Sequence, residues 1–269
     1  MLIALLCVLV ALILIFTGDR GAKSIVTTAI HAGLLIAAIF LMYRGLPPIA
    51  VTAVTCLAIS AVTAFYQNDG DIKSRIAFVS VIIVILVLIP VVFWFADAAN
   101  AEGFNNAQYE ITDTNGYTRN IGLNMLQLQI SVMIIALIGT VIDIAIAITS
   151  SIYEIRSSVE KLTFGQLVET GFTTSRAILN TSIHTIFYIY IAEYLTLMIQ
   201  YVDEYSFSRL INSQSFGAEF ISISISGIGC CLVVPVATLM AIFFVTPDQV
   251  NAVSGTKLSN DSNVKSMKL

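Results

Sequence analysis

Hydrophobic residues are grouped along the chain in seven long runs, and short polar stretches separate these runs. An apolar helix of about 20 residues crosses the roughly 30 Å of hydrocarbon in a bilayer. The pattern therefore predicts an all-α integral membrane protein, with residues 1–245 in one transmembrane helical domain and residues 246–269 in a polar, disordered cytoplasmic tail. The predicted helices are Leu2–Thr17, Ile25–Tyr43, Ile49–Tyr66, Ile76–Ala96, Leu126–Tyr153, Ala177–Gln200 and Glu219–Val245.

The composition of the chain agrees with a lipid environment. Of its 269 residues, 57% are hydrophobic and only 11% are charged, and the mean hydropathy is +0.90. A soluble core of this size does not require so many apolar residues. The first run has no positive stretch before it and no small-residue cleavage site after it, so we expect an uncleaved anchor rather than a removed signal peptide.

Basic residues in the connections predict how the chain crosses the membrane. If the N-terminus is outside, ten of the 13 lysines and arginines fall in inner connections or in the tail, and only Arg44, Arg119 and Arg209 fall outside. Because cytoplasmic loops carry the excess of basic residues, the sequence predicts an outer N-terminus and a cytoplasmic C-terminus.

Two connections carry local signals. In the polar outer stretch 97–125, Asn115-Gly116 predicts a short hairpin. In the inner stretch 156–176, Thr163 and Gln166 form a capping-box pattern. The apolar residues that follow predict a short helix along the inner membrane surface, and docking of a cytoplasmic protein is the alternative.

Glycine and proline interrupt two of the predicted helices. Pro90 lies inside the fourth run, and the stretch 226–235 places two glycines and a proline in the seventh. Such breaks can serve gates or cavities. Close packing of helices is the explanation that we favour here.

One ionisable residue, Asp143, lies within the fifth run, where a bare carboxylate is costly. At 100° per residue, small and polar residues share its helix face, and a row of aliphatic residues forms the opposite face. We expect the aliphatic face to contact lipid and the polar face to contact protein. The aliphatic residues are Leu137, Val141, Ile144, Ile148 and Ile152; the polar face holds Ala136, Gly139, Thr140, Asp143, Ala147, Ser150 and Glu154.

The sixth run carries a second polar face, formed by Ala177, Asn180, Thr181, His184 and Tyr188. Both histidines of the chain, His31 and His184, fall near the depth of Asp143, and a carboxylate and an imidazole at one level can share a proton. The candidate residues for proton coupling or for lining a path are therefore Asp143, His184, Thr140, Ser150, Asn180, Thr181 and His31.

Purely structural roles are the alternative for these residues. Asp143 can be held by a hydrogen bond to Thr140 or to a neighbouring helix, and His184 can cap Asn180 or a backbone carbonyl. Glu193 lies on the opposite face of its helix from His184, where we expect an interfacial or partner contact.

The stretches 137–155 and 162–195 resemble the YibE/F-like family of bacterial membrane proteins. The residues that fit the family pattern are Gly139, Asp143, Ile148, Glu154, Gly171, Arg176, Thr181, Thr185 and Tyr190. His184 stands where the family usually has Asn, Ala177 where it usually has Asp, and Ala192-Glu193 where it usually has a Gly-Gly pair. A proton relay through His184 would therefore be specific to this branch.

The resemblance implies a small permease-type protein of the cytoplasmic membrane of Gram-positive bacteria, often encoded beside a related protein and without a firm substrate. A looser similarity is to one transmembrane half of the RND permeases, which include the SecD/SecF subunits. It implies an RND-half-like bundle of the last six helices, an N-terminal anchor helix, and residues 43–49 in place of a large outer domain.

The first functional hypothesis is a subunit of a proton-coupled transporter or exporter of a small molecule or ion, with Asp143 as the coupling carboxylate and His184 as its partner. The subunit would assemble with a related YibE/F-like protein or with itself. The alternative is an accessory or scaffold protein that assembles with a related partner. We expect no enzyme activity, cofactor, metal or nucleic acid, because the sequence has no zinc-binding histidine pair, protease-like Ser-His motif or phosphate-binding glycine loop.

Overall fold

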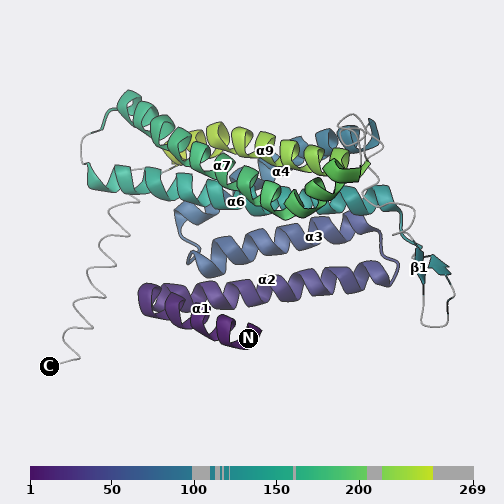
Figure 1. The fold of residues 1–269 in the computed structure, drawn as a ribbon. Helices are drawn as coiled ribbons and strands as arrows, with labels where there is room; N and C mark the ends of the chain where they lie inside the picture. Colours follow the sequence, from purple (N-terminus) through teal and green to yellow (C-terminus); the bar gives the residue numbers. More distant parts are fainter. Residues whose placement is uncertain are drawn as a thin grey trace.

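The computed structural model describes residues 1–98, 110–112, 116, 118–120, 122–159, 162–204 and 214–244. Within them the chain is helical apart from one short hairpin, which confirms the predicted all-α fold (Figure 1). The helices are α1 (Leu2–Thr17), α2 (Asp19–Tyr43), α3 (Pro48–Ala61), the π-helix η1 (Val62–Gln67), α4 (Ile72–Ala98), α6 (Met125–Ser158), α7 (Phe164–Glu204) and α9 (Gln214–Phe244). The hairpin strands are β1 (Glu110–Thr112) and β2 (Thr118–Asn120).

Five of these helical segments are long and apolar enough to cross a membrane: α2, α3 continued by η1, α4, α6 and α9. Helix α1 is apolar but shorter. Several helices begin before the predicted run, as α2 does at Asp19 rather than Ile25. A hydrophobic run marks the part of a helix that can lie in lipid, whereas backbone hydrogen bonding continues into the polar flanks.

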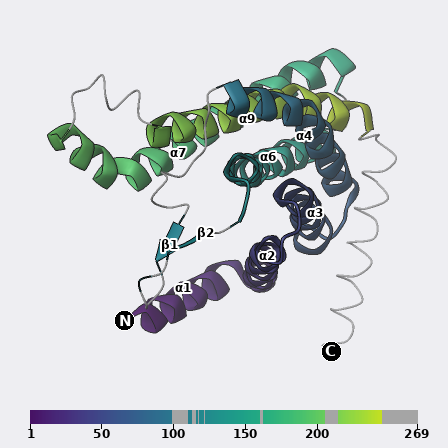
Figure 2. The ribbon, with the colours of Figure 1, turned by 90° about the vertical axis from the view of Figure 1, so that its right-hand side faces the viewer.

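Helix α6 is the centre of the bundle. It packs against α9, α4, α3 and α7, and Figure 2 shows it between the α2–α3 pair and the α4–α9 pair, with α7 on one flank. The main hydrophobic core lies between α4, α6 and α9, where Leu88, Leu137, Ile148 and Val233 are buried. Helix α1 packs on α2 at the edge of the bundle.

The glycine-containing stretch of α9 serves close packing. A Cβ atom at Gly229 would lie 2.2 Å from Cδ1 of Leu137 on α6 and 3.2 Å from Cδ1 of Leu88 on α4. No larger residue fits this point without movement of its neighbours, so Gly229 brings α9 against both helices. Gly227 has no such neighbour within 4 Å.

The α6–α7 connection partly departs from expectation. The capping box at Thr163 is confirmed: its backbone N–H donates to Gln166 Oε1 at 3.1 Å, and the Gln166 N–H donates to Thr163 Oγ1 at 3.4 Å. The predicted separate surface helix is wrong, because α7 continues unbroken from Phe164 to Glu204. At 1.5 Å per residue it is about 61 Å long. Within the described residues it is not among the five candidate spans, so the predicted span Ala177–Gln200 stays a prediction.

The predicted hairpin is confirmed. Strands β1 and β2 pair antiparallel with Ile111 opposite Arg119. Gly116 lies between them with a φ of 78°, a left-handed conformation that glycine adopts without steric cost. The predicted disordered tail, residues 246–269, lies outside the described residues.

One end of the bundle, which we call the basic end, is formed by residues 18–23, 67–75, 156–159 and 162–166. Contacts join these segments: Lys23 pairs with Asp69, and the Lys73 Nζ lies 5.9 Å from the centre of the Tyr153 ring. The side chain of Arg156 donates to the carbonyl of Leu162 at 3.5 Å. The connections that the sequence assigned to the inner side are thus at one end.

Candidate functional site

Asp143 lies well inside the α6 span. It follows the first residue of the helix by eighteen positions and precedes the last by fifteen, or about 27 Å and 22 Å along the axis. Its side chain is exposed, as is Gly139 one turn earlier. The part of the chain that the structure describes therefore leaves this carboxylate uncovered at membrane depth, where a bare charge is costly.

The expected orientation of α6 is wrong. The aliphatic face that we expected in lipid is buried against α4 and α9: the exposed fractions of Leu137, Val141 and Ile148 are 0%, and that of Ile144 is 3%. The polar face points the other way. We call it the α6 polar strip, and its members are exposed (Gly139, Asp143, Glu154) or partly exposed (Ala136, Thr140, Ala147, Ser150).

The imidazole that interacts electrostatically with the Asp143 carboxylate belongs to His31 of α2. His31 Nε2 lies 3.2 Å from Oγ1 of Thr63. The Thr63 hydroxyl donates to the carbonyl of Ile59 at 2.9 Å, so its oxygen can accept a hydrogen bond from Nε2–H of His31.

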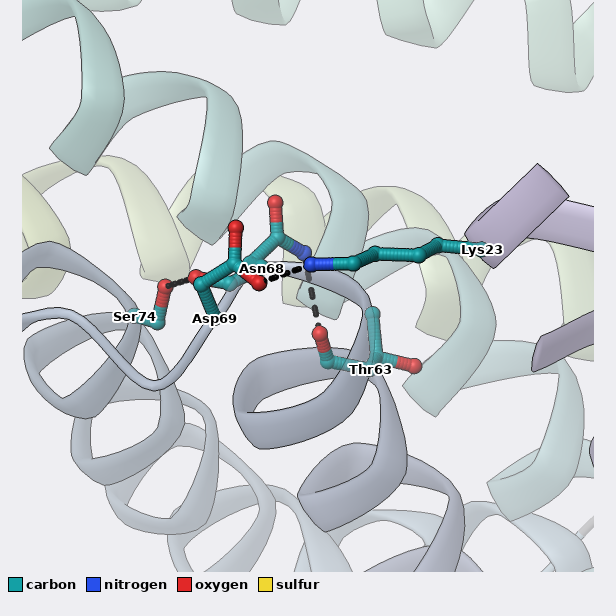
Figure 3. A network of polar contacts seen from close by, with 5 residues as sticks. All are labelled: Lys23, Thr63, Asn68, Asp69 and Ser74. Atoms are coloured by element: carbon teal, nitrogen blue, oxygen red, sulfur yellow. Dashed lines mark hydrogen bonds and ion pairs between the residues drawn. The ribbon is translucent and has the colours of Figure 1, made fainter. Parts of the chain in front are cut away.

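Thr63 is placed by the π-helix η1, where Thr63 itself is buried. The wider turn leaves its carbonyl to accept from Nδ2 of Asn68 at 2.9 Å, and the Asn68 carbonyl accepts from Ser74 Oγ at 3.0 Å (Figure 3). A π-helical turn inside a membrane helix is rare and often occurs at a functional site. No sequence signal pointed to Thr63, because a threonine in an apolar run does not disturb its periodicity.

The same network reaches the basic end. Lys23, two turns before His31 on α2, pairs with Asp69 just after η1 (Figure 3). The hydrogen bond from Lys23 lowers the pKa of the Asp69 carboxyl, and the nearby charges of Lys23 and Arg20 act in the same direction. Asp69 and Gly70 have φ values of 59° and 63°, so the turn that joins η1 to α4 is left-handed at both positions.

His184 and its neighbours form an exposed stripe on α7. Asn180, Thr181, His184 and Tyr188 are all exposed, and the His184 ring stacks on Tyr188 with centroids 6.5 Å apart. The face of α7 that packs against α9 carries other polar groups. The Ser175 and Thr238 hydroxyls are 2.7 Å apart in a buried contact, and those of Tyr190 and Ser222 are 3.4 Å apart.

The structure thus brings together only some of the predicted site residues. Asp143 interacts electrostatically with His31, whereas His184 lies on the outward face of another helix. Thr140 donates its hydroxyl to the Leu137 carbonyl at 3.0 Å and interacts with the thiol of Cys230, so its proton is not directed to Asp143. Ser150 is partly exposed on the α6 polar strip, and the side chain of Glu193 lies outside the described residues.

Other potential binding features are few. Within the described part of the chain, no three His, Cys, Asp or Glu side chains are grouped as metal ligands would be. A cleft of about 540 Å3 opens between the C-terminal part of α4 and the N-terminal part of α6, away from Asp143. Pro90 helps to form it, so the proline in α4 borders a cavity while Gly229 in α9 serves packing. Its lining residues are Pro90, Phe93, Trp94, Asp97, Asn124, Leu126, Gln127 and Ile130.

The long apolar helices around a central α6 define a multi-pass α-helical membrane protein. Comparison with known families then gives a more particular assignment: the model of the YibE/F-like protein family matches residues 5–247, and the chain belongs to that family. No curated protein and no solved structure matches the chain. The similarity to one half of an RND permease therefore stays a prediction.

Proposed function

We propose that the chain is a subunit of a proton-coupled membrane transporter or exporter, in which Asp143 binds and releases the coupling proton. One observation carries this proposal: a carboxylate in the middle of the α6 span is exposed at membrane depth, and the His31 imidazole interacts with it electrostatically. Ionisable side chains inside membrane segments are rare and commonly serve ion or proton pathways. The substrate, a small molecule or an ion, is left open.

The chemistry assigned to the pair is a proton exchange. When Asp143 is ionised, a protonated His31 compensates its charge; when Asp143 holds the proton, His31 can be neutral and donate through Nε2–H to Thr63. Either state avoids an isolated charge at membrane depth. Because Thr63 belongs to η1, a change at His31 acts directly on the π-helical turn and its link to the basic end.

We also propose that the protein lies in the bacterial cytoplasmic membrane with its N-terminus outside and its C-terminus inside. The basic end supports this orientation, since it gathers Arg20, Lys23, Lys73, Arg75 and Arg156, while Arg44 lies at the other end of α2. The uncovered α6 polar strip supports assembly with a second copy or with a related family member.

The test of proton coupling is the substitution Asp143→Asn. The amide keeps the size and the hydrogen-bonding capacity of the carboxyl but cannot titrate. We expect the variant to insert and fold like the native protein. Unlike the native protein, it should fail to correct the growth defect of a deletion strain. Glu169→Gln, on an exposed carboxylate near the start of α7, is the matched control and should retain activity.

A direct measurement complements the growth assay. Dicyclohexylcarbodiimide reacts with protonated carboxyls in apolar surroundings, so mass spectrometry should find Asp143 modified, with a yield that rises as the pH falls. His31→Asn should change that pH profile, because the neighbouring charge is removed, whereas His184→Asn should have a milder effect. Full activity of Asp143→Asn would exclude the coupling role and favour an accessory or scaffold function.

A further inference from the structure

Two exposed polar surfaces lie on the same bundle without a cover from the described chain. The α6 polar strip points away from α4 and α9, and the α7 stripe with Asn180 and His184 points away from α9. The first carries an acid, Asp143, and the second carries a base, His184. Lipid cannot satisfy either group, because hydrocarbon offers no hydrogen-bond partner.

The two groups lie at a similar depth, as α9 shows when it is used as a common reference. Ser175 of α7 is level with Thr238, and Tyr190 with Ser222. By interpolation, His184 is level with the neighbourhood of Gly229, which itself contacts Leu137 and Val141 of α6. Asp143 comes two residues after Val141 and six residues after Leu137, so its depth differs from that of His184 by no more than about 9 Å along the helix axis.

A symmetric pair of chains satisfies both groups. A two-fold axis along the membrane normal preserves depth, and in an isologous interface each surface meets its complement on the other copy. An acid on one surface and a base on the other make the face self-complementary in charge. The small residues of the strip let a second helix approach closely, and a Cβ atom built at Gly139 would have no neighbour within 4 Å.

We infer that the α6 polar strip and the α7 stripe form the contact surface for a second copy of this chain, with Asp143 of each copy against His184 of the partner subunit. The dimer deepens the proposed function, on which it rests for the existence of a partner. In this dimer each Asp143 has two imidazole partners, His31 from the same chain and His184 from the other. It also explains why a polar helix face is directed outward from a membrane bundle.

The test is site-directed cross-linking in native membranes. Two differently tagged chains, one with Asp143→Cys and one with His184→Cys, are co-expressed after the exposed Cys7 and Cys231 have been replaced by serine. Mild oxidation should give a disulfide-linked dimer that contains both tags. The control pair combines His184→Cys with Leu86→Cys, an exposed position on α4 that belongs to neither surface, and should give several-fold less product.

A second measurement covers the possibility that the cysteine variants fold poorly. The native protein in lipid nanodiscs should have the mass of a dimer, and the exchange Asp143→His with His184→Asp in one chain should keep that mass, whereas Asp143→His alone should reduce the dimer fraction. A monomeric native protein, or cross-linking no stronger than in the control pair, would overturn the inference. Cross-links only to a different membrane protein would also overturn it. Loss of activity in Asp143→Asn would still support proton coupling in either case.

Discussion

The substitution Gly229→Ala tests whether the contact between α9 and α6 is as tight as the structure indicates. The new methyl group would lie 2.2 Å from Leu137 Cδ1, 3.1 Å from Val141 Cγ2 and 3.2 Å from Leu88 Cδ1. All three neighbours are at most 1% exposed, so the Leu137 side chain must move within the packed core to make room. Overpacking of this kind typically costs about 1–3 kcal/mol.

Gly227→Ala is the matched control, because a Cβ atom at Gly227 has no neighbour within 4 Å on the same helix. Alanine favours a helix over glycine by up to about 1 kcal/mol, so this variant should be as stable as the native protein or more stable. The assay is thermal unfolding of the purified proteins in one detergent. At about 2–4 °C per kcal/mol for a chain of this size, Gly229→Ala should lower the Tm by about 2–12 °C. Equal Tm values for the two variants would refute the close contact.

The remaining predictions concern a buried hydrogen bond and the membrane orientation. Ser175→Ala and Thr238→Val remove the two sides of the 2.7 Å contact between α7 and α9. A double-mutant cycle should give a coupling of about 0.6 kcal/mol, the average for interhelical hydrogen bonds in bacteriorhodopsin, and strictly additive effects would contradict a contribution of this bond to stability. A cysteine introduced by Ser262→Cys should react with an impermeant maleimide only after the membrane is opened, and labelling of intact cells would reverse the proposed orientation.

The helices could be predicted from the sequence because a helix that lies in a membrane requires a continuous run of apolar residues. Runs of apolar residues must span the hydrocarbon, and all backbone groups inside it must be hydrogen-bonded within a helix. The local signals were equally direct: Asn115-Gly116 marked the hairpin and Thr163 with Gln166 marked the start of α7. These features depend on residues close together in the chain, so no knowledge of the packing was needed.

The site was only partly predictable. Asp143 and His31 could be selected because an ionisable group in an apolar run is conspicuous, but the interaction between them depends on how α2 packs beside η1 and α3. Thr63 could not be selected, since its importance comes from the π-helical turn and from its 3.2 Å contact with His31. The pairing of Asp143 with His184 of the same chain was expected from depth alone, and depth does not specify the direction in which a side chain points.

The sequence by itself determined that the chain is a helical membrane protein, where its hydrophobic runs lie, and that Asp143 is at membrane depth. The tertiary structure decided which face of α6 is buried. In water, the apolar face of a helix must turn inward, but lipid is as apolar as leucine and imposes no such rule. Shape therefore selects the face: Leu137, Val141 and Ile148 fill the space against α4 and α9, where Gly229 admits them, and the polar strip with Asp143 is left on the outside.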